Sequence, residues 1–127
     1  MKKSNALPTD SELEILQFLW ANGPSSVKAV NAYLNKLRDV GYTTTLKIMQ
    51  IMTDKALVSR DTTQRQHIYE AKIEEKETKN SMVKDLIDSA FAGSSTNLVL
   101  QALGSSKISM TDLKEIKKLI KQIEKDS

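Results

Sequence analysis

The chain has 127 residues, of which 28% are charged and 5% aromatic, and its formal net charge is +3. This length accommodates one domain of average size, or a small domain with an assembly element, and the composition favours a helical protein with an aliphatic core. The absence of cysteine excludes disulfide scaffolds and thiolate chemistry, and the single His67 offers little for metal or acid–base work, so no metal or cofactor is expected. Residues 1–72 hold ten Lys and Arg against seven Asp and Glu, which permits an anionic partner such as DNA without requiring one.

The first expected helix runs from Asp10 to Asn22. Thr9 and Glu12 have the spacing of a capping box, in which each residue's side chain accepts a hydrogen bond from the other's backbone. Leu13, Leu16 and Trp20 form one apolar stripe, with Ile15 and Leu19 beside it. This wide apolar arc predicts that the helix packs in a core and that the tryptophan belongs to it.

A second helix is expected after the break at Gly23 and Pro24. Ser25 or Ser26 can cap it, and its apolar period continues through Leu37. A short connection then leads to Gly41. The apolar stripe of this helix consists of Val27, Val30, Leu34 and Leu37.

The stretch Gly41–Leu57 predicts a third helix with two different faces. The face expected to pack in the core carries Thr45, Met49, Met52 and Ala56, with Ile48 beside it. The opposite face carries Thr43, Lys47, Gln50 and Asp54. Two helices, a short turn and a third helix form a helix–turn–helix, so the polar face can be a recognition surface for a DNA major groove. The alternative is an ordinary solvated helix face, which is the default for an amphipathic helix.

The period then changes from helical to alternating, which predicts a β-hairpin. Residues 61–66 form its polar tip and residues 66–73 its second strand. A hairpin behind three helices is the wing of a winged helix, in which Arg60 and Arg65 can contact the phosphate backbone. The alternative is an exposed turn whose arginines serve solubility. His67 is interpreted as a strand residue rather than a metal ligand.

Three more helices are expected in the second half of the chain. Gly93 follows the end of the first, Thr96 or Asn97 opens the second, and Gly104 closes it. Ser109 can cap the last helix, whose apolar residues repeat at close to heptad spacing.

These three helices carry too few apolar residues to form an independent globule, so we expect them to pack on a second copy. The expected domains are therefore a winged-helix DNA-binding domain at residues 1–72 and a helical dimerisation domain at residues 73–127. The alternative is a monomeric extension folded onto the first half. The residues expected in the dimer interface are Val83, Leu86, Ile87, Phe91, Leu98, Leu113, Ile116, Ile120 and Ile123.

Several stretches, in this order, resemble the penicillinase repressors, which are dimeric winged-helix transcriptional repressors: SELEILQFLW, GYTTTLKIMQIMTDKALVSRD, HIYEA, FAGS, NLVLQAL and ISMTDLKEIKKLI. The resemblance implies a mainly α fold with a small β-hairpin wing, followed by a helical dimerisation region. It also implies a homodimer bound to a dyad operator in double-stranded DNA. By position, the residues that would meet DNA are Tyr42, Thr43, Thr44, Lys47 and Gln50, with Arg60 and Arg65 in the wing.

The sequence also departs from the family pattern. Many members carry arginine where Ile51 stands, and some carry another where Leu46 stands. In the β-lactam-responsive members, a membrane metalloprotease pathway leads to cleavage at an Asn-Phe bond that would align with Gln101 and Ala102. The resemblance therefore implies release by cleavage between Gln101 and Ala102 through such a pathway, although this chain lacks the Asn-Phe pair. The copper-responsive members use cysteine pairs, which this chain does not have.

Two other classes of function remain as alternatives. The winged helix could serve as a protein-interaction module without specific DNA binding, which the low net charge and Ile51 keep open. An enzyme is the weakest interpretation, because no carboxylates have the spacing of an acid–base pair. The longest uninterrupted apolar run, Phe18–Ala21, has four residues, so we expect a cytoplasmic protein without membrane insertion.

Overall fold

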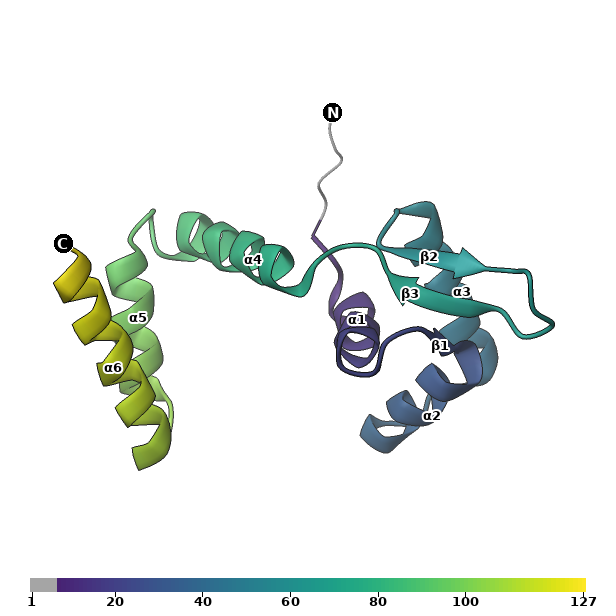
Figure 1. Cartoon of the computed structure of the whole chain (residues 1–127), viewed down its shortest axis with the longest axis horizontal. Coiled ribbons are helices and arrows are strands. Elements are labelled where there is room, and N and C mark those ends of the chain that lie inside the picture. Colours follow the sequence, from purple (N-terminus) through teal and green to yellow (C-terminus); the bar gives the residue numbers. More distant parts are fainter. Residues whose placement is uncertain (1–6) are drawn as a thin grey trace. The chain divides into compact units, whose positions relative to one another are not determined.

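The computed structural model describes residues 7–127, which are mostly helical with a small antiparallel sheet (Figure 1). The chain divides into two compact units, one that ends at Val83 and one that comprises Lys84–Ser127. The domain boundary expected after residue 72 stays a prediction. The elements of the described part are α1 (Asp10–Asn22), β1 (Ser25–Ser26), α2 (Val27–Leu37), α3 (Tyr42–Asp54), β2 (Val58–Asp61), β3 (Ile68–Ala71), α4 (Glu75–Ala90), α5 (Ser95–Ser105) and α6 (Met110–Asp126).

The first helix, α1, has the predicted bounds and the predicted cap. The Glu12 backbone N–H donates to Thr9 Oγ1 at 3.2 Å, and the Thr9 backbone N–H donates to Glu12 Oε1 at 2.9 Å. At the other end Gly23 has a φ of 80°, and its N–H donates to the Leu19 carbonyl at 2.7 Å. The positive φ at this position suits glycine and turns the chain sharply out of the helix.

The sheet contains one strand more than the predicted hairpin. β2 and β3 pair antiparallel as expected, and the two residues of β1 pair with the other edge of β3, which gives the order β1-β3-β2. Ser26 belongs to β1 and also caps α2, since its Oγ accepts a hydrogen bond from the Ala29 N–H at 3.1 Å. His67 precedes β3 instead of lying within it, so the predicted strand start at residue 66 is wrong.

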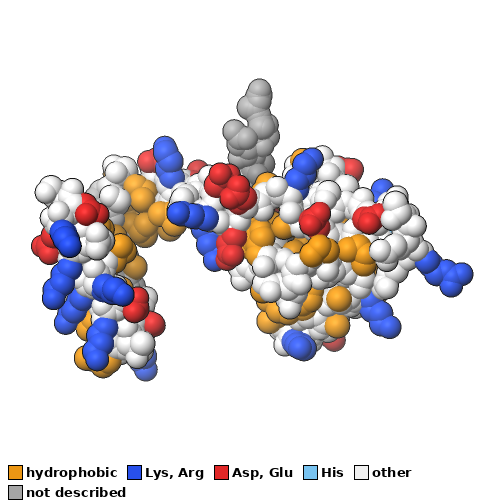
Figure 2. Space-filling view, viewed as in Figure 1, with side chains coloured by type: hydrophobic (Ala, Val, Ile, Leu, Met, Phe, Trp, Pro, Cys, Tyr) orange, Lys and Arg blue, Asp and Glu red, His pale blue; other side chains and the backbone are white. Residues whose placement is uncertain are grey.

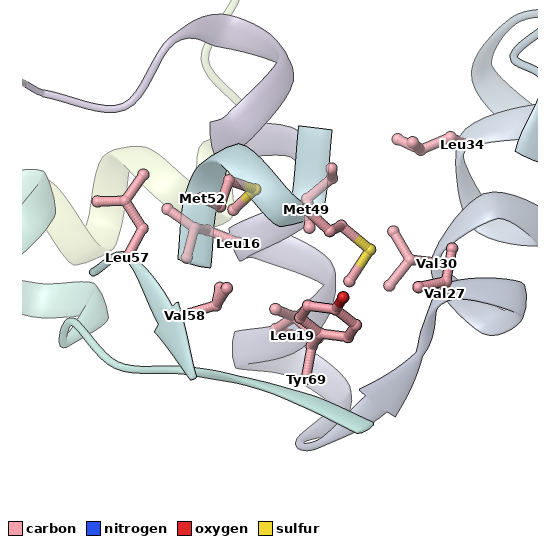
Figure 3. Packing of buried hydrophobic residues seen from close by; sticks show 11 residues of the cluster. Leu16, Leu19, Val27, Val30, Leu34, Met49, Met52, Leu57, Val58 and Tyr69 are labelled. Atoms are coloured by element: carbon pink, nitrogen blue, oxygen red, sulfur yellow. The ribbon is translucent and has the colours of Figure 1, made fainter. Parts of the chain in front are cut away.

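One core joins α1, α2, α3 and the sheet. Met49 of α3 points toward Val30 of α2 and Tyr69 of β3, and all three are fully buried (Figure 3). Trp20 packs at the edge of this core, where its Nε1 donates to the Ile73 carbonyl at 3.0 Å. The buried members are Ile15, Leu16, Leu19, Val27, Val30, Leu34, Met49, Met52, Leu57, Val58 and Tyr69.

Leu37 does not continue the buried stripe of α2 as predicted. It is the last residue of the helix and its side chain is 51% exposed. The chain leaves the core at this point, because Arg38 is already in extended backbone conformation.

Ala56, predicted on the buried face of the third helix, is exposed and lies outside the helix. The helix ends at Asp54, and Ala56 adopts a left-handed conformation with a φ of 64°. The Ala56 N–H donates to the Thr53 carbonyl at 3.0 Å, and the Leu57 N–H donates to the Met52 carbonyl at 2.9 Å. These two hydrogen bonds form a Schellman motif, whose left-handed residue is usually glycine.

Replacing Ala56 with glycine is therefore expected to raise the free energy of unfolding by about 0.5–1 kcal/mol, because the left-handed conformation costs an L-residue about 1–2 kcal/mol. Urea denaturation at neutral pH measures this effect. The matched control is Ala32→Gly on the exposed face of α2, where glycine should lower the free energy of unfolding by about 1 kcal/mol. A decrease at both positions would contradict the expected effect.

The last three helices differ from expectation mainly in α5. This helix begins at Ser95 with Ser94 as its N-cap, whose Oγ accepts a hydrogen bond from the Asn97 N–H at 3.1 Å. Gly104 lies inside α5 and does not close it, so both predicted ends are wrong. Ser109 caps α6 as predicted, with its Oγ accepting from the Asp112 N–H at 3.0 Å. No helix in the described part of the chain has the length and apolar character needed to cross a membrane.

Candidate DNA-binding surface

α3 presents the two faces that the sequence predicts. Thr45, Met49 and Met52 are fully buried, and Thr43, Lys47, Gln50 and Asp54 are exposed on the opposite side. Tyr42 is 52% exposed at the start of the helix, with Thr44 exposed beside it. Ile51 is 42% exposed, so this polar surface also contains a sizeable apolar side chain. The helix therefore offers hydroxyl, amide and ammonium groups to a partner from one side.

The first turn of α3 differs from those of α1 and α2. Its N-cap is Gly41, which provides no side-chain hydrogen bond, whereas Thr9 and Ser26 cap the two preceding helices through their side chains. The first N–H groups of a helix carry a partial positive charge that favours anions. An α3 whose first turn lacks a side-chain cap suits contact with a phosphate group.

The turn between α2 and α3 is held by two asparagines of α2, Asn31 and Asn35, which lie outside the predicted apolar stripe of that helix. Asn31 Nδ2 donates to the Val40 carbonyl at 3.0 Å and to Thr45 Oγ1 at 2.8 Å. Asn35 Nδ2 donates to the same Val40 carbonyl at 2.8 Å, and Asn35 Oδ1 accepts from the Val40 N–H at 3.2 Å. Both polar groups of the Val40 backbone are therefore satisfied by side chains of α2.

A second connection that the sequence did not predict holds the opposite end of α3. Lys55 Nζ lies 3.0 and 2.8 Å from the two carboxylate oxygens of Glu12. Glu12 is 3% exposed, whereas the Lys55 side chain is 39% exposed. Burial raises the pKa of Glu12, but the hydrogen bonds from Lys55 and from the Thr9 backbone outweigh burial, so the pKa lies below its ordinary value.

The wing places its two arginines differently. Arg60 lies in β2 directly opposite the buried Tyr69, but Arg60 itself is exposed. Arg65 is exposed in the tip between β2 and β3. The Thr63 hydroxyl and backbone N–H donate to Asp61 Oδ1 at 2.7 and 2.9 Å, and these hydrogen bonds lower the pKa of Asp61.

The basic side chains of α2, α3 and the wing differ in whether a carboxylate neutralises them. Both terminal N–H groups of Arg38 donate hydrogen bonds to the Glu14 carboxylate, at 2.8 and 2.7 Å. Within residues 7–127, Lys47, Arg60 and Arg65 form no salt bridge. Their charges are therefore available to an anionic partner. No three His, Asp or Glu residues of this same range are grouped so that they could hold a metal ion.

The two residues at the expected cleavage position, Gln101 and Ala102, are exposed and lie within α5. Cleavage between them and a membrane metalloprotease pathway stay predictions. A pocket of about 620 Å³ in the same unit is lined by Phe91, Asn97, Leu100, Gln101, Gly104 and Ser105.

Three helices, a hairpin packed behind the third of them, and an exposed polar face on that helix define a winged helix–turn–helix protein of the DNA-binding class. A sequence model for the penicillinase repressor matches residues 8–122, which is nearly the whole chain. The chain therefore belongs to the penicillinase repressor family, whose members are DNA-binding transcriptional repressors, as the resemblance implied. A comparison with curated proteins found no match.

Proposed function

We propose that the protein acts as a homodimer on a dyad operator, with α3 of each copy in a major groove. The observation that carries this proposal is the exposed face of α3, on which Thr43, Lys47 and Gln50 lie opposite three fully buried residues. Glutamine can pair bidentately with adenine, and a threonine methyl can contact the thymine methyl. Lys47 and the wing arginines Arg60 and Arg65 carry charges that suit the phosphate backbone.

The apolar side chains of the second half support the dimeric part of the proposal. Ile120 and Ile123 in α6 are 47% and 57% exposed, and no residue of Lys84–Ser127 is buried. Hydrophobic side chains also reach the surface on α4 (Figure 2). Exposed apolar faces of this extent mark interaction sites. All nine residues expected in the interface are half-buried or exposed, so each is accessible to a second copy: Val83, Leu86, Ile87, Phe91, Leu98, Leu113, Ile116, Ile120 and Ile123.

Fluorescence anisotropy tests the proposal with a duplex selected by this protein from a random-sequence pool. We expect the selected duplex to contain two half-sites about one helical turn apart, and the logarithm of affinity to fall linearly with the logarithm of salt concentration. Scrambling one half-site should weaken binding strongly, because the two recognition helices are linked in one dimer. A fully scrambled duplex is the control. Binding that does not respond to salt, or selection that yields no common sequence, would contradict the proposal.

A further inference from the structure

Three hydrogen bonds between α2 and the turn before α3 converge on the backbone of one residue, Val40. Val40 lies just before the N-cap of α3, and its backbone carbonyl accepts hydrogen bonds from both Asn31 and Asn35. Its N–H donates to Asn35 Oδ1. Asn35 also donates to the Asn31 carbonyl at 2.8 Å, one turn earlier in the same helix. The two asparagines are thus neighbours on α2 that share one acceptor in the turn.

The same network continues into the first turn of α3. Thr45 is fully buried, and its hydroxyl accepts from Asn31 Nδ2 at 2.8 Å while it donates to the Gly41 carbonyl at 3.3 Å. This arrangement explains why a hydroxyl residue occupies the buried face of α3, because both of its hydrogen-bonding functions have partners there. Asn31 therefore connects α2 to the turn and to the recognition helix at once.

We propose that Asn31 and Asn35 are positioning residues that fix the rotation and register of α3 relative to α2, and that sequence discrimination depends on them. The remaining packing between these helices comes from apolar side chains such as Val30, Leu34 and Met49, and hydrophobic contact has no preferred direction. Gly41 has no side chain that could fix the start of α3, and a glycine adds backbone freedom. Within the described residues, the hydrogen bonds that join this end of the helix to α2 are those of the two asparagines.

This inference rests on the proposed DNA-reading role of α3, because a positioning residue matters to a surface that must match base edges. Base contacts require side chains held to within about 0.5 Å of their productive positions. Phosphate contacts made by long basic side chains carry no sequence information and tolerate small shifts of the helix. Loss of the asparagine contacts should therefore reduce specific binding and spare non-specific binding.

The experiment compares Asn31→Leu and Asn35→Leu with the matched control Asn22→Leu. Leucine has nearly the shape of asparagine, keeps the charge unchanged and removes the donors. Asn22 makes the same kind of hydrogen bond, to the Phe18 carbonyl at 2.9 Å, at the end of α1 and outside the α2–α3 turn. Each variant is measured for affinity to the selected duplex and to a scrambled duplex, and for its thermal unfolding midpoint.

We expect the ratio of the two affinities to fall about tenfold or more in Asn31→Leu and Asn35→Leu, with affinity for scrambled DNA within about twofold of wild type. Asn22→Leu should keep the wild-type ratio. Equal losses on both duplexes, or no loss on either, would overturn the positioning role. If one asparagine variant does not fold, the other decides the question.

A measurement without DNA separates this inference from the proposed function. Amide hydrogen exchange of Val40 in the full chain should be about tenfold faster in Asn35→Leu than in wild type, because its N–H loses its acceptor. The Asn22→Leu control should leave it unchanged. If the wild type binds no selected duplex, the proposed function fails, while faster exchange still supports the positioning role of Asn35. Unchanged exchange overturns that role whatever DNA binding shows.

Discussion

Replacing both Lys47 and Gln50 with alanine is expected to reduce discrimination between the selected duplex and scrambled DNA by about 100-fold or more. A good bidentate side-chain–base pair contributes about 1–3 kcal/mol of discrimination, and in a homodimer Gln50→Ala removes such a pair from two half-sites. The single variants separate base reading by Gln50 from phosphate binding by Lys47. Gln50→Ala should lower affinity for the selected duplex alone, whereas a phosphate-bound Lys47 should also affect scrambled DNA and the salt dependence.

This loss should occur without a loss of stability. Both side chains are exposed, and alanine is the best helix former, so the thermal unfolding midpoint of the double variant should stay at the wild-type value. The matched control is Gln17→Ala with Lys114→Ala, which removes the same amide and the same charge from exposed positions on α1 and α6. The proposed recognition surface would be wrong if this control lost as much discrimination as the Lys47 and Gln50 variant.

The sequence predicted the faces of α3 well because they depend on local spacing alone. Residues three and four positions apart share a side of a helix, so Thr45, Met49 and Met52 were correctly assigned to the core. The same spacing failed at Ala56, since the Schellman motif ends the helix before that position is reached. An alanine gives little warning of a left-handed conformation, for which glycine is the usual signal.

Contacts between distant residues were not predictable in this way. Glu12 and Lys55 are 43 positions apart, and nothing in either helix alone indicates that they meet. Asn31 and Asn35 resemble ordinary exposed residues of an amphipathic helix, and their role depends on where the chain turns at Val40. β1 was missed because two serines show no alternating pattern, and they form a strand only because the edge of β3 lies beside them.

These unpredicted contacts share one consequence, since they hold α3 at both ends. Asn31 and Asn35 fix its start to α2, and Lys55, its C-cap residue, ties its end to the first turn of α1. The middle of the helix is held by apolar packing. The exposed face that we propose reads DNA is therefore carried by a helix whose two ends are tied to different helices of the same core.

The ion pair at the end of α3 gives the second large expected effect, on stability. Replacing Lys55 with methionine leaves the carboxylate of Glu12 buried without its cation, and we expect the free energy of unfolding at pH 7 to fall by about 1–3 kcal/mol. This range lies below that of a fully buried pair because Lys55 is 39% exposed and solvent screens the interaction. Glu12→Gln should cost about 1 kcal/mol or less, because the amide oxygen can still accept from Thr9 and the lysine can turn toward water.

The pH dependence of this difference provides its test. The pKa of Glu12 is depressed in the folded protein, so its stabilising effect is present above the unfolded pKa and is lost as pH falls through the lower folded value. Burial without Lys55 leaves a higher folded-state pKa, and the unfolded pKa is the same in both proteins, so the gap in free energy of unfolding between wild type and Lys55→Met should narrow as pH falls toward the depressed pKa of Glu12 in the wild type. Urea denaturation of both proteins at pH 7, 5 and 4 measures it, with Glu12→Gln as the variant that cannot titrate at this position. A gap that stays constant with pH, or a larger loss for Glu12→Gln than for Lys55→Met, would show that the pair does not hold the end of α3 in this way.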